Sequence, residues 1–149
     1  GSDINPGFGY NSFPGVSLEI SGDGSVVIIE DTYNRWVAFK FNNNEWIQIG
    51  ERYSPSPLES NSKGNLSANY DGTLVALGSP SYNNNQGRVV LFSYEDDQWN
   101  ILDEIYHPNA GANEMQRFGT SVYLNESGSR LAVATRSNNY DDEHYIYID

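Results

Sequence analysis

One strand–turn–strand pattern occurs three times in this chain and constrains its fold more than any other feature. The copies align at the turn glycines Gly24, Gly72 and Gly128, which lie 48 and 56 residues apart. They read SLEISGDGSVVIIED (17–31), NLSANYDGTLVALGS (65–79) and SVYLNESGSRLAVAT (121–135). A motif that recurs at such intervals is typical of folds assembled from repeated supersecondary units.

Each copy predicts a β-hairpin. Before the glycine, apolar residues alternate with polar ones, as at Leu18 and Ile20 in the first copy. After it they form a denser run, as at Val27 and Ile29. Alternation beside a short glycine turn is a hairpin signal. A second strand that is apolar on both faces indicates burial between two layers.

Further strands follow each hairpin. The predicted third strands are RWVAFKF (35–41), RVVLFSY (88–94) and HYIYID (144–149). A fourth strand is predicted twice, as EWIQIG (45–50) and QWNILDEI (98–105). Gly, Pro, Asn and Ser fill the connections, and none of them predicts a helix.

These features predict an all-β fold of β-propeller blades, each a four-stranded antiparallel meander, with about three blades of a larger or oligomer-completed propeller. A β-sandwich also has many short strands, but it gives no reason for one spacing to recur. We place the blades at approximately 5–53, 54–106 and 107–149, the last without its fourth strand. The opening GSDI (1–4) aligns with GERY (50–53) and hence resembles the end of a preceding blade.

Several segments resemble FG-GAP-type repeats, the units of the integrin α-like β-propeller. They are RFGTSVYLNESGSRLAVAT (117–135), YDGTLVALGSP (70–80), GRVVLFSY (87–94) and EWIQIG. The family's Phe-Gly stands at Phe118-Gly119, and its Gly-Ala-Pro at Gly78-Ser79-Pro80. The resemblance covers nearly the whole chain and suggests a fragment of about three repeats. It implies that the loops on one rim of the propeller face a ligand.

The charge balance argues against two classes of partner. Asp and Glu number 20 against 8 Lys and Arg, which gives a net charge of −12. Such a surface repels nucleic acid and anionic lipid, so we expect neither nucleic-acid binding nor membrane insertion. The longest aliphatic run, residues 26–29, is far too short to span a bilayer.

The repeat turns hold few carboxylates. The resemblance implies that calcium can bind in an Asp-rich loop between the first two strands, and such a site needs several converging carboxylates. Here the turns SGDGS, NYDGT and NESGS offer one each: Asp23, Asp71 and Glu126. Asp and Asn favour tight bends, so turn chemistry is the simpler interpretation. We predict no cofactor; calcium stays open, although the loop sequences do not support it.

No catalytic constellation stands out. The histidines are His107 and His144, and the chain has no cysteine, so a nucleophilic site would need Ser–His–Asp geometry. Acidic pairs occur at Asp96-Asp97 and Asp141-Asp142, but neighbours in sequence do not face each other across a substrate as a glycosidase pair must. We predict that the chain is not an enzyme, with a hydrolase as the least favoured function.

Candidate ligand residues lie in the loops between the second and third strands, at 31–35, 79–88 and 135–144. Each loop places a Tyr beside an Asn, and these residues are Tyr33, Asn34, Tyr82, Asn83, Asn139 and Tyr140. Tyr offers a flat apolar surface and Asn offers adaptable hydrogen bonds, which suits a protein or carbohydrate ligand. In the alternative interpretation, each Tyr packs on the neighbouring blade and each Asn accepts a bend.

We therefore predict a non-catalytic binding or adhesion module, extracellular or on a cell or virion surface, that recognises a protein or glycan through one propeller rim. The alternative is a purely structural building block of a larger surface, fibre or virion assembly. Because a blade cannot bury both faces alone, further blades of the same chain or other copies of it are expected partners. Trp46 and Trp99 recur on the fourth strand and are expected to pack between blades. The sequons at Asn65 and Asn125 leave glycosylation open.

Overall fold

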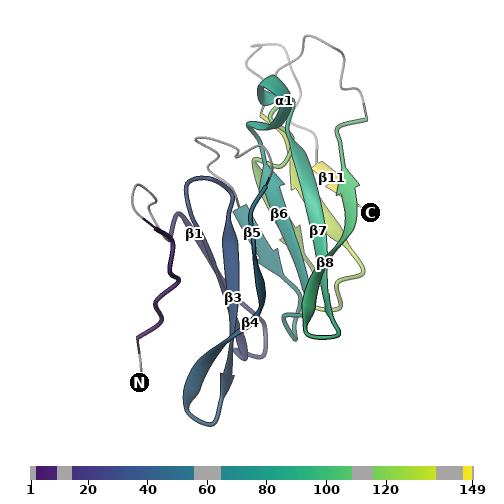
Figure 1. Cartoon of the computed structure of the whole chain (residues 1–149). Coiled ribbons are helices and arrows are strands. Elements are labelled where there is room, and N and C mark those ends of the chain that lie inside the picture. Colours follow the sequence, from purple (N-terminus) through teal and green to yellow (C-terminus); the bar gives the residue numbers. More distant parts are fainter. Residues whose placement is uncertain (1–2, 10–14, 56–64, 109–115, 137–145, 149) are drawn as a thin grey trace.

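The computed structural model describes residues 3–9, 15–55, 65–108, 116–136 and 146–148, which form three antiparallel β-sheets (Figure 1). The first sheet contains, in order, β1 (Ser17–Ile20), β2 (Val26–Glu30), β3 (Trp36–Asn42) and β4 (Glu45–Tyr53). The second contains β5 (Asn65–Ala68), β6 (Leu74–Ser79), β7 (Arg88–Glu95) and β8 (Gln98–Ile105). In the third, β10 (Leu131–Ala134) lies between β9 (Ser121–Leu124) and β11 (Ile146–Ile148).

Each sheet is the meander that the sequence predicts. The hairpins pair around their turn glycines, so that Val27 lies opposite Ile20 and Val75 lies opposite Ala68. The predicted third and fourth strands pair in chain order as well. An unpredicted element is α1 (Tyr82–Asn85), a single turn between β6 and β7 in which Asn83, Asn84 and Asn85 all have positive φ. Among the described residues, no helix is long and apolar enough to cross a membrane.

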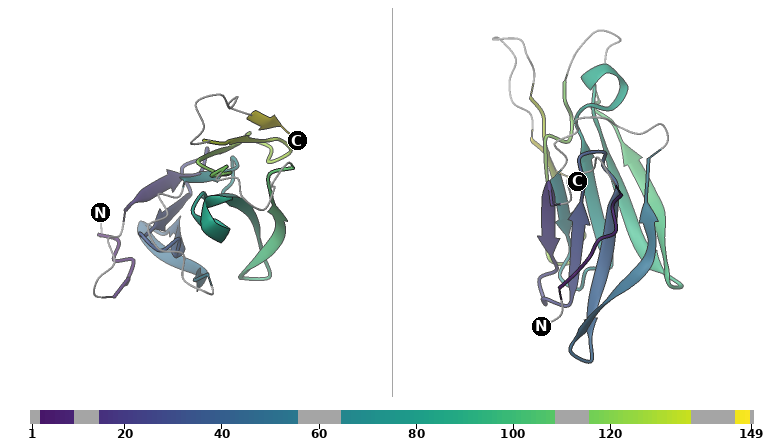
Figure 2. Two further views of the ribbon diagram at one scale, coloured as in Figure 1. Left: turned by 90° about the horizontal axis from the view of Figure 1, so that it is seen from above. Right: turned by 60° about the vertical axis from the view of Figure 1, so that its left-hand side comes forward.

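The three sheets pack side by side, as Figure 2 shows from two further directions. The first strands of the sheets contact one another from β1 to β5 and from β5 to β9, while the last strands β4 and β8 also meet. A first inter-sheet core contains Val26, Ile28, Trp36, Ala38, Leu66, Val75, Leu77, Val90 and Phe92. A second inter-sheet core contains Ala76, Val89, Phe118, Val122, Leu124, Leu131 and Val133. The second sheet is therefore buried on both faces, as predicted for a propeller blade.

The repeated turns interlock the sheets at one end. The backbone N–H of Asp23 donates to the carbonyl oxygen of Tyr70 at 2.8 Å, and the N–H of Tyr70 donates to that of Glu126 at 2.8 Å. Gly72 lies against the Val26 side chain of the first sheet, where an added Cβ would clash. Each turn is thus both a hairpin bend and a contact with the neighbouring sheet, which explains why the motif recurs.

A close backbone contact joins the second and third sheets. Gly119 has a φ of +86°, and a Cβ there would lie 2.6 Å from the carbonyl oxygen of Arg88. A Cβ on Gly78 would in turn clash with the carbonyl oxygen of Gly119. Phe118, which precedes Gly119, is fully buried in the second inter-sheet core. The glycines let the backbones approach closely enough for this ring to fill the core.

The N-terminal segment covers part of the other face of the first sheet. A third cluster there contains Ile29, Val37 and Phe39, packed against Ile4 and Phe8. Trp46, predicted to pack between blades, lies against this cluster and against Phe41 of its own sheet, with the Phe41 and Trp46 ring centroids 5.1 Å apart; the described residues place no second sheet there, so this stays a prediction. The proposed blade boundaries, and the likeness of residues 1–4 to the end of a blade, stay predictions.

We expect Gly119→Ala to destabilise the fold more than Gly24→Ala. Gly24 has a φ of +73° and open space around an added Cβ, so its replacement should cost about 1 kcal/mol in backbone strain alone. Gly119→Ala adds a clash with the Arg88 backbone. This substitution should therefore lower the free energy of unfolding by about 3 kcal/mol. Urea denaturation followed by tryptophan fluorescence measures both values. Equal losses would show that the close contact is not needed for stability.

Candidate functional site

Both described rim loops hold a tyrosine against an arginine. The rim is the end of the sheets that carries the β2–β3 loop, the β6–β7 loop and α1 (Figure 1). The guanidinium carbon of Arg35 lies 5.3 Å from the centre of the Tyr33 ring. That of Arg88 lies 4.1 Å from the centre of the Tyr82 ring. The two arginines occupy equivalent places, just before β3 and at the start of β7.

Each of these arginines also binds a carboxylate. Arg35 donates from Nε to Oδ2 of the buried Asp31 at 2.8 Å. Arg88 donates from Nη1 to Oε1 of Glu104 at 3.0 Å. A guanidinium that is bonded by a carboxylate and covered by an aromatic ring is held in one orientation. The rim tyrosines are therefore held half-buried, with part of each ring exposed.

Tyr106 extends the rim beside Tyr82. The two ring centroids lie 6.0 Å apart, and the Tyr106 hydroxyl donates to Oε2 of Glu104 at 2.6 Å. That hydrogen bond is the main cause that raises the pKa of Tyr106 to about 12. The phenol therefore stays protonated at neutral pH. The sequence did not reveal Glu104 and Tyr106 as rim residues, because only the pairing of β8 with β7 brings them there.

The two described rim asparagines differ in exposure. Asn34 is fully buried, has a φ of +55°, and donates from Nδ2 to Oγ of Ser79 in the second sheet at 2.7 Å. Its burial favours the structural interpretation over ligand contact. Asn83 is exposed, has a φ of +47°, and donates to the side chain of Gln86. Asn139 and Tyr140 lie outside the described residues, and their role stays a prediction.

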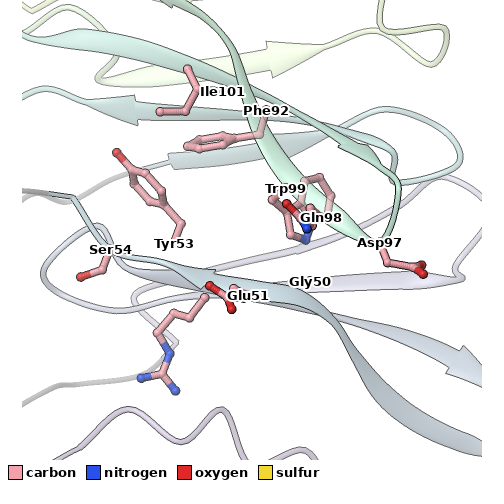
Figure 3. Close-up of a pocket in the computed structure, with 10 residues that line it drawn as sticks. Gly50, Glu51, Tyr53, Ser54, Phe92, Asp97, Gln98, Trp99 and Ile101 are labelled. Carbon is pink, nitrogen blue, oxygen red and sulfur yellow. The ribbon is translucent and has the colours of Figure 1, made fainter.

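A cleft of about 580 Å³ opens between the first and second sheets, where β4 faces β8 (Figure 3). It is lined by Gly50, Glu51, Arg52, Tyr53, Ser54, Phe92, Asp97, Gln98, Trp99 and Ile101. The aromatic part of its wall comes from both sheets, and the Tyr53 and Phe92 ring centroids lie 4.7 Å apart in an edge-to-face contact. Sequence analysis did not find this cleft, because its residues meet only when the two sheets pack.

Trp99 joins the two sheets at the cleft. Its Nε1–H donates to the carbonyl oxygen of Ile49 on β4 at 3.1 Å. Its ring packs edge-on against Trp36, with centroids 5.0 Å apart. Gly50, with a φ of +65°, lies against the indole, where an added Cβ would clash. The prediction that Trp99 packs between blades is confirmed.

The cleft is negatively charged. Glu51 and Asp97 are both exposed, and within the described part of the chain neither forms an ion pair. The basic lining residue, Arg52, is bonded to the N-terminal segment instead. Its Nη2 donates to the carbonyl oxygens of Pro6 and Gly7 at 2.9 and 3.0 Å.

The carboxylates of the first two repeat turns bind their own turns. Asp23 accepts from the Ser21 hydroxyl at 2.7 Å and from the Ser25 N–H at 2.8 Å. Asp71 accepts from the hydroxyl and the N–H of Thr73 at 2.6 and 3.1 Å. These bonds lower the pKa of both carboxyls, the largest effects coming from the Ser21 and Thr73 side chains. Turn chemistry thus accounts for both residues. The described residues contain no group of three or more His, Asp or Glu placed to hold a metal ion.

The described candidates for catalysis occupy structural positions. His107 is buried and packs edge-on against Phe118, with ring centroids 5.7 Å apart. Asp96 and Asp97 form the β7–β8 turn, with φ values of +51° and +60°. His144 and the pair at 141–142 lie outside the described residues. The absence of catalysis stays a prediction.

No protein-family model and no curated protein matches the sequence. The chain is similar to several solved structures, among them the following two. The β-propeller domain of Cps50 (Swd1) from Myceliophteria thermophila has a TM-score of 0.54 and 11% identity, covering 89% of this chain and 39% of that one. TolB from Acinetobacter baumannii has a TM-score of 0.49 and 10% identity, covering 89% and 29%. The chain spans less than half the length of either structure. With its four-stranded antiparallel sheets, the likeness to the Swd1 propeller confirms the predicted fold class.

Asp71→Asn should reduce the loss of stability in acid. The lowered pKa of Asp71 means that the folded chain binds this proton less readily than the unfolded chain, whose carboxyl titrates near 3.8. The stabilisation is therefore complete above that pH and is lost as the pH falls through the folded pKa. Thermal unfolding at about pH 7 and about pH 3 should show a smaller difference for Asp71→Asn than for the wild type. Asp3→Asn removes an equal charge outside the turns; the same reduction there would contradict the turn assignment.

Proposed function

We propose that this chain is part of a non-catalytic binding module that recognises a protein or carbohydrate ligand through its rim. The proposal rests on one repeated arrangement: Tyr33 and Tyr82 lie in corresponding loops of two blades, and each contacts an arginine that a carboxylate binds. Aromatic side chains held in this way lose little conformational entropy when a ligand contacts them. Their hydroxyls add hydrogen bonds to an otherwise flat apolar surface.

We also propose that the blades are of the FG-GAP type. The two halves of the family motif, Phe118-Gly119 and Gly78-Ser79-Pro80, meet across neighbouring sheets. A Cβ on Gly119 would lie 3.1 Å from Cα of Gly78. The motif therefore has a physical role here, because its glycines admit the close approach and its Phe fills the inter-sheet core. By this resemblance the rim is the ligand-binding side.

The proposed setting is extracellular or on a cell or virion surface, which the same resemblance supports. A purely structural building block is the second candidate. It is favoured by the bond from Asn34 to Ser79, because this bond makes a rim loop hold two sheets together. We propose no catalysis for either candidate. Turnover by the homogeneous chain on a broad hydrolase panel would overturn that.

Replacing Tyr33, Tyr82 and Tyr140 together separates the two candidates. On a protein or glycan array, the triple Tyr→Ala variant should lose at least about tenfold in affinity for the ligand that the wild type selects. Its Tm should fall by only a few degrees. The triple Tyr→Phe variant is the matched control, since it keeps the rings over Arg35 and Arg88. Unchanged binding together with a large loss of Tm in the Ala variant would favour the structural building block.

Further blades of the same chain or other copies of it are a second proposed kind of partner. Leu18 and Ile20 on β1 are 65% and 56% exposed, whereas Leu66, the counterpart of Leu18 on β5, is 6% exposed because the first sheet covers it. The face of β1 thus has the apolar pattern of an inter-sheet contact. An exposed pattern of this kind favours contact with another sheet.

The isolated chain should therefore associate with other copies of itself. We expect light scattering at micromolar concentration to give a mass above that of the monomer. Leu18→Lys with Ile20→Lys should shift the population towards monomer, because charge on this face opposes packing. Ile47→Lys is the control, an exposed apolar residue on β4. A folded, monodisperse wild-type monomer would contradict the prediction.

A further inference from the structure

We infer that the cleft between β4 and β8 binds an arginine side chain of a partner protein. This site is separate from the rim and does not depend on the ligand proposed there. The cleft combines the aromatic rings of Tyr53 and Trp99 with the carboxylates of Glu51 and Asp97 (Figure 3). Its volume of about 580 Å³ lies within the range of pockets that enclose small ligands.

The chain itself places a tyrosine ring and a carboxylate around one guanidinium at two positions on the rim. At the rim, Arg35 and Arg88 each lie over a tyrosine ring and bond a carboxylate. The cleft is lined by the same two kinds of group, aromatic rings and carboxylates, and Oδ1 of Asp97 accepts a hydrogen bond from the Tyr94 hydroxyl at 3.3 Å. The guanidinium of the lining residue Arg52 is held outside, by the carbonyl oxygens of the N-terminal segment and at 4.8 Å from the centre of the Phe8 ring.

Charge selects the class of ligand. Glu51 and Asp97 form no ion pair within the described residues, and the chain as a whole carries a net charge of −12. The cleft therefore attracts cations and repels anions. Because both carboxylates are exposed, salt screens this attraction, and a single cationic group binds weakly.

The shape of the aromatic wall favours a guanidinium over other ligands. Trp99 packs against Trp36 and Tyr94, each with a ring centroid 5.0 Å away, so its half-buried indole is held in one position in the wall of the cleft. A planar guanidinium is thin enough to lie against the exposed part of such a wall while it donates to a carboxylate. A lysine ammonium is a strongly hydrated point charge and lacks the planar contact.

Titration with short peptides tests the inference on the full chain. The probe is acetyl-Gly-Arg-Gly-amide, and its match contains citrulline, which has a nearly identical shape without the charge. The indole N–H signal of Trp99 in ¹H–¹⁵N NMR reports on the cleft. We expect the arginine peptide to shift this signal with a Kd of about 1 mM, and the citrulline peptide to bind at least about fivefold more weakly. Raising the salt concentration should weaken the arginine peptide further.

Two matched double substitutions of carboxylates test whether the arginine peptide binds in the cleft. Glu51→Gln with Asp97→Asn should weaken the arginine peptide at least about fivefold. Glu45→Gln with Asp103→Asn makes the same charge change at exposed positions of β4 and β8 outside the cleft, and should weaken it less than about twofold. The triple Tyr→Ala rim variant should bind the arginine peptide as the wild type does, so failure of the rim proposal would not affect this result.

Several outcomes would overturn the inference. One is equal binding of the citrulline peptide, or of a third probe, acetyl-Gly-Lys-Gly-amide. Another is an equal loss of affinity in the two pairs of carboxylate variants. A third is displacement of the arginine peptide by a neutral disaccharide that shifts the Trp99 signal. The last of these would assign the cleft to a glycan. The absence of any Trp99 shift at about 20 mM arginine peptide would also overturn it.

Discussion

The structure depends on burial of both faces of its second sheet. Val75, Leu77 and Phe92 face the first sheet, while Ala76 and Val89 face the third. A single four-stranded sheet with two apolar faces leaves both of them exposed to water, so it needs a neighbouring sheet on each side. The turn contacts, the buried Phe118 and the glycine approaches all serve to hold those neighbours in place.

The packing that stabilises the contact between the first and second sheets also shapes the cleft between them. Trp36 contacts both Phe92 and Trp99 at 5.0 Å between centroids, and this aromatic cluster fixes the distance between the two sheets. Where β4 and β8 pass beyond the cluster, side chains of mixed polarity line a cavity. The shape of this cleft therefore depends on the buried aromatic cluster beside it.

The strands, their order and the buried second sheet could be predicted from the sequence, because alternation and turn glycines are local signals. The rest depended on distant contacts. Beside Tyr33, Asn34 looks like a ligand residue until Ser79, 45 residues away, is seen to accept its hydrogen bond. Arg52 likewise carries no signal that it binds the N-terminal segment. Trp46 and Trp99 share one sequence position, yet only Trp99 has a second sheet to pack against among the described residues.

The bonds between the repeat turns restrict where this chain can change in length. Strand register around Gly24, Gly72 and Gly128 is the same in all three sheets, although the glycines are 48 and 56 residues apart. Part of the difference lies at the rim, where Arg35 follows Gly24 by 11 residues and Arg88 follows Gly72 by 16. An insertion in a repeat turn would break its bond to the neighbouring turn, whereas an insertion at the rim leaves every strand pair intact. Loop length can therefore change at the rim, where new surface shapes can arise without disturbing the core.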